Sequence, residues 1–166
     1  MAVMYVAPAE ARKGKDKGWD DYIAPTVTAE QALSTVKAAL PKLTVGQCFV
    51  KTGKRGEKSL EVALVLEGNI VSKIRLNPTT GEILPKGQKA FTPQVLASRE
   101  QALKIVEQSI PNLEVASVQL GKHGEWKVDL TLKKAVVATI SVHGRNGSIL
   151  PNWKASRDVA MYPSFN

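Results

Sequence analysis

The residues that could take part directly in chemistry are two histidines and a single cysteine. A metal site at His123 or His143 would need at least two more converging ligands, and none recurs at ligand spacing. Nucleophilic catalysis would need a serine or Cys48 beside a histidine and an orienting acid. The chain also contains no Gly-x-Ser-x-Gly or Gly-x-x-x-x-Gly-Lys motif. We therefore predict that the protein is not an enzyme, and that it has no catalytic residue, no metal site and no cofactor.

Cys48 itself lies within the apolar-rich run 45–50. A single cysteine excludes an internal disulfide and a metal site built only from cysteines. An apolar neighbourhood also disfavours the thiolate, which is the reactive form of the side chain. We predict that Cys48 is a buried small hydrophobic residue.

The densest basic element is the segment 51–58, where four cations accompany one anion. A hairpin tip of this composition could bind a phosphate or an acidic protein surface. The alternative is a solvated turn whose charges keep it soluble. The segment lacks aromatic side chains on which bases could stack, and this disfavours binding of single-stranded nucleic acid. The candidate polyanion-binding residues are Lys51, Lys54, Arg55 and Lys58.

The net charge of +8 is spread along the chain rather than gathered in a tail. Residues 1–27 carry four basic and four acidic groups, for a net charge of 0. Residues 28–90 carry ten and five, net +5, and residues 91–166 carry nine and six, net +3. This distribution indicates a general attraction for anions more than a dedicated nucleic-acid arm.

An internal repeat sets the elements that must position these residues. Residues 28–36 align with residues 98–106 at an offset of 70, and both contain Glu-Gln-Ala-Leu. Residues 81–85 match residues 147–151 at an offset of 66. The difference of four residues falls in one hairpin, where a duplicated fold tolerates a change of length.

Each repeat predicts one helix followed by three strands. Ser/Thr-x-x-Gln capping boxes start the helices at Thr28 and Ser98, and Pro41 and Pro111 end them. Alternating apolar residues then predict strands, with Trp126 at the head of an inward-facing row. The first and third strands of each repeat are expected near 43–50, 70–76, 113–120 and 136–142.

The predicted fold is therefore α+β, with two tandem αβββ units, each consisting of one helix packed on a three-stranded antiparallel sheet. Because a unit of about sixty residues is only marginally stable alone, we expect the two units to pack together. The predicted organisation is an N-terminal arm (1–27), repeat 1 (28–90), repeat 2 (91–151) and a C-terminal aromatic tail (152–166).

The repeats resemble PepSY domains over residues 28–85 and 98–151. The resemblance lies in the capped helix with Glu-Gln-Ala-Leu, the three strands, and the closing sequence Asn77-Pro-Thr-Thr-Gly-Glu-Ile-Leu84. In repeat 2 the closing turn departs to His143-Gly-Arg-Asn-Gly147. The resemblance implies a non-catalytic domain that acts through protein contacts, as an inhibitor or a folding aid. It also suggests an extracytoplasmic location, although the chain shows no signal-peptide pattern and no apolar run long enough to span a membrane.

The two arms hold six of the nine aromatic residues of the chain. We interpret both arms as extended segments whose aromatic residues either anchor a partner or cover the protein's own sheets. The outward positions of the second strand in repeat 1 include Ala63 and Val65, whereas repeat 2 has polar residues there. We therefore expect this face of repeat 1 to be covered, by an arm, by repeat 2 or by a partner. The predicted partner-binding residues are Trp19, Tyr22, Ala63, Val65, Trp153 and Tyr162.

Our leading interpretation is a non-enzymatic protein-binding module: an inhibitor, a chaperone-like factor or an accessory subunit of a larger complex. Its expected partner is another protein, and the positive net charge favours an acidic one. The alternative is a protein that binds nucleic acid or another polyanion through its basic surface. A third interpretation is a carrier of a small ligand or metal. The sequence does not specify the compartment.

Overall fold

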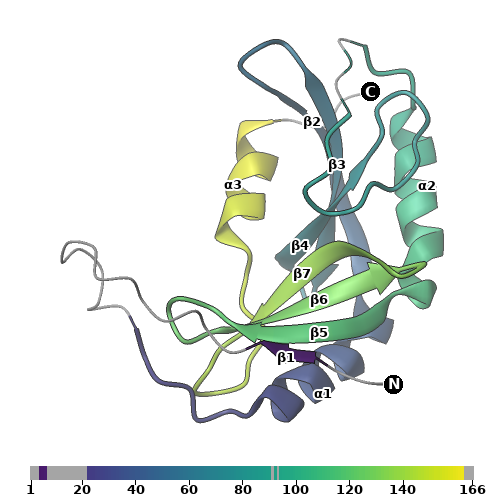
Figure 1. Ribbon diagram of the computed structural model, residues 1–166. Helices are drawn as coiled ribbons and strands as arrows, with labels where there is room; N and C mark the ends of the chain where they lie inside the picture. The colour runs from purple at the N-terminus through teal and green to yellow at the C-terminus, as the bar shows by residue number, and fades with distance from the viewer. Residues whose placement is uncertain (1–3, 7–21, 91, 93, 163–166) are drawn as a thin grey trace.

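The computed structural model describes residues 4–6, 22–90, 92 and 94–162 (Figure 1). Repeat 1 contains α1 (Ala29–Ala39), the 3-10 turn η2 (Leu40–Lys42), β2 (Thr44–Thr52), β3 (Lys58–Leu66) and β4 (Asn69–Leu76). Repeat 2 contains α2 (Arg99–Ser109), η3 (Ile110–Asn112), β5 (Glu114–Leu120), β6 (Trp126–Leu132) and β7 (Ala135–Val142). Two further elements flank them, β1 (Met4–Val6) and α3 (Trp153–Met161).

The helices begin where the capping residues predict. The Thr28 hydroxyl accepts the Gln31 amide at 3.2 Å, and the Gln31 side chain accepts the Thr28 amide at 2.8 Å, which completes a capping box. In repeat 2 the Ser98 hydroxyl accepts the Gln101 amide at 3.1 Å, but the reciprocal bond to the Gln101 side chain is absent, so the predicted capping box is only half formed. A proline follows the first residue of each 3-10 turn and ends the helix before the first strand.

The strands form two antiparallel sheets with the same order, β2-β3-β4 and β5-β6-β7, and β1 adds to the edge of β5 in parallel. The second hairpins share an irregularity at equivalent positions, after Leu64 in β3 and after Leu130 in β6. The bridge that follows each closing turn also recurs at the offset of 66, between Leu76 and Ile83 and between Val142 and Ile149. The predicted α+β fold of two αβββ units is confirmed.

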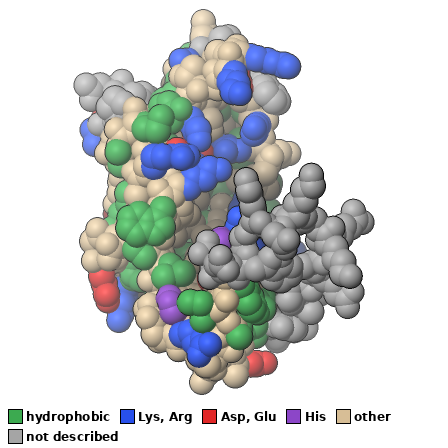
Figure 2. All heavy atoms as spheres, turned by 90° about the vertical axis from the view of Figure 1, so that its left-hand side faces the viewer, with side chains coloured by type: hydrophobic (Ala, Val, Ile, Leu, Met, Phe, Trp, Pro, Cys, Tyr) green, Lys and Arg blue, Asp and Glu red, His purple; other side chains and the backbone are tan. Residues whose placement is uncertain are grey.

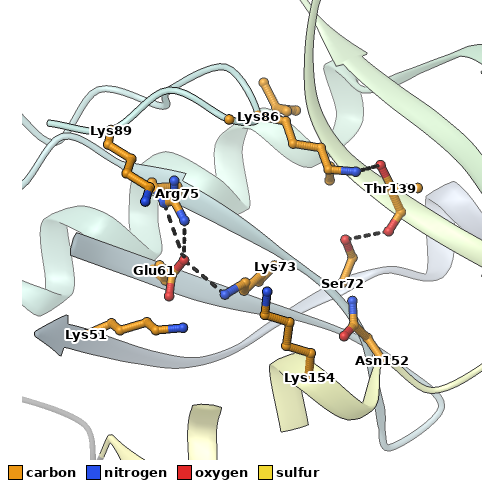
Figure 3. A pocket seen from close by; sticks show the side chains of 13 residues that line it. Lys51, Glu61, Ser72, Lys73, Arg75, Lys86, Lys89, Thr139, Asn152 and Lys154 are labelled. Carbon is orange, nitrogen blue, oxygen red and sulfur yellow. Dashed lines mark hydrogen bonds and ion pairs between the residues drawn. The ribbon is translucent and has the colours of Figure 1, made fainter. Parts of the chain in front are cut away.

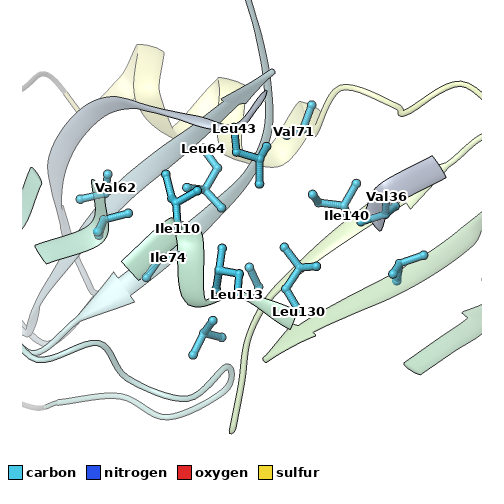
Figure 4. Close-up of a cluster of buried hydrophobic side chains, with 14 of the residues drawn as sticks. Val36, Leu43, Val62, Leu64, Val71, Ile74, Ile110, Leu113, Leu130 and Ile140 are labelled. Carbon is cyan, nitrogen blue, oxygen red and sulfur yellow. The ribbon is translucent and has the colours of Figure 1, made fainter. Parts of the chain in front are cut away.

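Each helix packs on the sheet of the other repeat, and not on the sheet of its own αβββ unit as the sequence analysis expected. Helix α1 contacts β5, β6 and β7, whereas α2 contacts β2 and β3 (Figure 1). Val36 of α1 and Ile140 of β7 belong to the same buried cluster (Figure 4). We call this arrangement the helix exchange. It joins the buried residues of both repeats into one apolar cluster. The two units therefore pack together, as expected, and they share a single hydrophobic core.

The chain that follows each closing turn crosses to the last strand of the other repeat. The Lys86 amide donates to the Val136 carbonyl at 2.7 Å, and the Asn152 amide donates to the Ile70 carbonyl at 2.8 Å. These two hydrogen bonds are related by the same offset of 66 residues. They flank the line where β4 meets β7, and there the Ser72 hydroxyl donates to the carbonyl of Thr139. The two repeats are therefore tied together by symmetric crossings.

The Trp126 ring is buried, with 4% of its surface exposed, as its place at the head of an inward row predicts. Its indole N–H donates to the Val27 carbonyl at 2.7 Å, just before the capping residue of α1. This bond links repeat 2 to the start of the helix that covers its sheet.

The turn between β6 and β7 has two non-glycine residues in the left-handed region, whereas its counterpart between β3 and β4 has one. Lys133 and Lys134 have φ angles of 49° and 68°, whereas the equivalent residues are Glu67 at 50° and Gly68 at 83°. A residue other than glycine in this left-handed region costs roughly 1–2 kcal/mol.

We predict that Lys134→Gly stabilises the protein by about 0.5–1 kcal/mol, because glycine adopts this conformation without strain. Chemical denaturation measures the change. Lys122→Gly is the matched control, since Lys122 is an exposed hairpin residue whose φ is not positive, and it should give no gain. Equal effects of the two substitutions would contradict the assignment of strain to the β6–β7 turn.

Candidate binding surface: the basic cleft and helix α3

A cleft of about 400 Å³ opens where β4 meets β7, beneath the segment 86–89 and beside the first turn of α3 (Figure 3). Residues from both repeats line it, so the helix exchange and the symmetric crossings build this site. Its polar lining includes Ser72, Thr139, Asn152 and Glu61. We call it the basic cleft because of its six cationic lining residues, Lys51, Lys73, Arg75, Lys86, Lys89 and Lys154.

The basic cleft carries a strong positive charge. Six cations and the single carboxylate of Glu61 give its lining a formal charge of 6 − 1 = +5. The carboxylate of Asp158, which pairs with Lys51 and Lys73, reduces the charge of this cluster to +4, half of the +8 of the whole chain. A concave surface with charges of one sign focuses the electrostatic potential and attracts ligands of the opposite sign.

Glu61 lies at the floor of the basic cleft and is fully buried. Its Oε1 atom lies 3.0 Å from Lys73 Nζ and 3.3 Å from Arg75 Nη2. Its Oε2 atom has no hydrogen-bond partner among the described residues. A buried carboxylate is stable only when cations or donors compensate for lost hydration, and here one of its two oxygens lacks such compensation.

Helix α3 is fixed over the outer face of the repeat 1 sheet by a buried carboxylate. Asp158, which is 1% exposed, lies 3.1 Å from Lys51 Nζ and 3.0 Å from Lys73 Nζ. Burial by itself would raise the pKa of Asp158, but the hydrogen bonds and charges of Lys73 and Lys51 outweigh it and lower the pKa. Asp158 is therefore ionised at neutral pH, and it links α3 to both β2 and β4.

The opposite face of α3 points into solvent. Trp153, Arg157 and Met161 are spaced four residues apart and so lie along one stripe of the helix. Their exposed fractions are 79% for Trp153, 64% for the Arg157 side chain and 61% for Met161. Figure 2 shows hydrophobic side chains on this side of the molecule next to a cluster of Lys and Arg side chains. The exposed stripe therefore adjoins the basic cleft.

The structure places the predicted partner-binding residues in three regions. Ala63 is fully buried and Val65 half-buried in β3. Trp153 and Tyr162 lie at the two ends of α3, and the Lys51 ammonium lies 5.9 Å from the centroid of the Tyr162 ring. Tyr22 is exposed. The amide of the next residue, Ile23, donates to the backbone carbonyl of His123 in the β5–β6 hairpin of repeat 2. Trp19 lies outside the described residues.

The expectation that the outer face of repeat 1 is covered is confirmed, because α3 packs on β4 and β2. The tail was expected to be extended, and the structure instead folds residues 153–161 into a helix. The physical reason is local: the Asn152 side chain caps the helix by accepting the Ala155 amide at 2.9 Å, and Ala155 and Asp158 share the face that packs on the sheet. The sequence did contain a signal for this helix: Asn152 is a favourable capping residue, and Ala155 and Asp158 follow it at helical spacing.

The four predicted polyanion-binding residues do not form one site. Lys51 lines the basic cleft, whereas Lys54 and Arg55 are exposed at the tip of the β2–β3 hairpin. Lys58 donates to the Thr52 hydroxyl across the base of the same hairpin. The sequence analysis did not identify Lys86, Lys89 and Lys154 as site residues, because they come together only through the crossing of chain segments between repeats.

His143 has a local structural role in the closing turn of repeat 2. His143 Nδ1 accepts the amides of Arg145 and Asn146 at 3.1 and 3.2 Å. The Asn77 side chain does the same for Thr79 and Thr80 in repeat 1. The divergent closing turn of repeat 2 therefore keeps the hydrogen bonding of the first.

Cys48 is buried, as predicted, and burial raises its pKa to about 11. Its thiol therefore stays protonated at neutral pH. Among residues 4–6, 22–90, 92 and 94–162, no group of three or more His, Cys, Asp or Glu side chains could hold a metal ion. None of the described helices is long and apolar enough to cross a membrane.

Comparison with known proteins gives no relative: no family model, no curated protein and no solved structure matches the chain.

We predict that the docking of α3 depends on pH through Asp158. Because the folded-state pKa of Asp158 is lowered, its stabilising effect is fully present above the unfolded value of about 3.9 and is lost as pH falls through the folded value. Amide chemical shifts of α3, followed by NMR as pH falls below about 4, should show the helix detach. Asp158→Asn should weaken docking at neutral pH and remove this transition.

The control for this experiment is Asp129→Asn, which removes a carboxylate from the outer face of repeat 2, where it accepts from Ser117 and Thr139. This variant should leave the acid transition of α3 in place. An α3 that stays docked in Asp158→Asn, with unchanged amide shifts, would show that apolar packing rather than the ion pairs fixes the helix.

Proposed function

We propose that this protein is a non-enzymatic protein-binding module whose contact surface is the exposed stripe of α3 together with the adjoining basic cleft. The observation that carries the proposal is Trp153. It is 79% exposed on a short helix that Asp158 and its two lysines fix to the sheet. A large aromatic residue held outward on an anchored helix is costly to leave in water, and tryptophan is the residue type most enriched at the energetic centres of interfaces.

The composition of the stripe supports the same proposal. Trp153, Arg157 and Met161 are all residue types enriched at protein interfaces, whereas lysine and glutamate are depleted there. Helix α3 uses only Ala155 and Asp158 as fully buried contacts with its own sheet. Its two largest apolar side chains, Trp153 and Met161, are therefore available to a partner.

The charge beside the stripe indicates the kind of partner. A lining of +5 favours a protein with an acidic segment next to an apolar pocket that receives Trp153, since complementary potentials speed association and select partners. The roles open to such a module are those of an inhibitor, a chaperone-like factor or an accessory subunit. The resemblance to PepSY domains points to the same class of roles and stays a prediction.

A second candidate function, binding of nucleic acid or another polyanion, is favoured by the same six cations. The two candidates differ in their salt dependence. Neutralising several phosphates gives a steep fall of log affinity with log salt concentration, whereas an interface centred on a buried tryptophan is much less sensitive to salt.

We predict that Trp153→Ala weakens partner binding on the order of 10- to 30-fold while leaving the melting temperature nearly unchanged. A photo-crosslinking residue at position 157 would first identify the partner in cells that naturally produce the protein. Isothermal titration with the purified partner then measures the affinity at several salt concentrations.

Leu96→Ala is the matched control, because Leu96 is also a large exposed apolar residue, with 66% of its surface exposed, but lies outside α3. This variant should bind normally. Normal binding by Trp153→Ala, or a steep salt slope that is the same in both variants, would reject the proposed surface and favour the polyanion alternative.

A further inference from the structure

We propose that the basic cleft is also a specific site for a small organic polyanion that carries a hydroxyl group beside its acidic groups, such as a hydroxy-polycarboxylate or a sugar phosphate. This inference goes beyond the proposed protein contact, and it does not depend on Trp153. It combines two features of the cleft that require different chemical groups in one ligand.

The first feature is a surplus of cations. Lys51 and Lys73 are paired with Asp158, and Lys73 and Arg75 with Glu61. The other three cations, Lys86, Lys89 and Lys154, have no acidic partner within the part of the chain that the structure describes. The Lys86 ammonium donates to the Thr139 hydroxyl. Three unpaired cations that line one cleft call for two or three negative charges on the ligand.

The start of α3 adds to this demand for negative charge. The first turn of α3 contains Lys154 and no acidic residue, although the partial positive charge at a helix N-terminus is normally complemented by an acid. A lysine there is unfavourable unless an anion lies between it and the cations across the cleft. Figure 3 shows the Lys154 side chain extending from α3 into the basic cleft, on the same side as Lys73.

The second feature is the Oε2 atom of Glu61. It belongs to a fully buried carboxylate that lines the cleft, and it has no hydrogen-bond partner among the described residues. A carboxylate oxygen can only accept, so a purely anionic ligand would repel it. Because this oxygen is buried, a ligand hydroxyl reaches it only when a side chain lining the cleft moves aside. The hydroxyl can then donate to it, and a hydrogen bond to a charged acceptor is stronger than a neutral one.

The size of the cleft fits this class of ligand. Its volume of about 400 Å³ lies within the range of small-molecule sites. The hydroxyl requirement distinguishes such ligands from simple anions, and Glu61 thereby acts as a selectivity residue. The site also depends on the crossing of the chain between the repeats, because Lys86 and Thr139 come from different repeats.

Citrate and tricarballylate provide a matched pair of probes, since both carry three carboxylates and only citrate has the hydroxyl. Isothermal titration at equal pH and ionic strength should show that citrate binds roughly tenfold more tightly, which corresponds to about 1.4 kcal/mol. In Glu61→Gln the ratio of the two affinities should fall towards one. The ratio is the informative quantity, because loss of the Glu61 charge strengthens binding of both anions alike.

Charge variants test the cations separately and remain informative if Glu61→Gln fails to fold. Lys86→Gln with Lys154→Gln should weaken both probes several-fold, whereas Lys54→Gln with Arg55→Gln, the same charge change at the exposed hairpin tip, should leave both affinities unchanged. Trp153→Ala should also leave them unchanged, which separates this site from the protein contact. Equal affinity of the native protein for the two probes, or no binding of either, would overturn the proposal.

Discussion

The structure depends on one packing constraint: each three-stranded sheet buries its apolar face under the helix of the other repeat. A single αβββ unit therefore cannot cover its own sheet in this arrangement. The exchange merges two marginal units into one core, and it makes the chain after each closing turn cross between the repeats. The basic cleft lies at that crossing, so stability and the candidate binding site share one origin.

The local elements could be predicted from the sequence, because short-range physics determines them. Thr28 and Ser98 cap helices, and alternation places Trp126 in the core. The helix exchange could not be predicted, since the two helices have apolar faces at equivalent positions and the sequence does not show which sheet each one covers. The cleft lysines could not be identified from the sequence either. Lys86 and Lys154 come to line the same cleft only because the chain crosses between the repeats, and their spacing along the sequence does not indicate a shared site.

The outer face of the repeat 1 sheet shows how charge replaces apolar packing. Glu61 and Asp158 are two buried carboxylates that share Lys73, and together they hold α3 against a largely charged surface. This arrangement leaves the apolar side chains of α3 outside. The same lysines that neutralise Asp158 extend towards the cleft, so the helix, its exposed stripe and the anion site form one continuous surface.

The most direct test of this account is whether the two repeats unfold together. Urea unfolding can be followed by labelling of Cys48, the only cysteine, which is buried in repeat 1, and by Trp126 fluorescence in repeat 2, with Trp19 and Trp153 replaced by phenylalanine. The helix exchange predicts coincident transitions with one midpoint, because neither sheet keeps its cover when the other repeat unfolds. Two separate midpoints would show that each repeat is stable alone and would contradict the account.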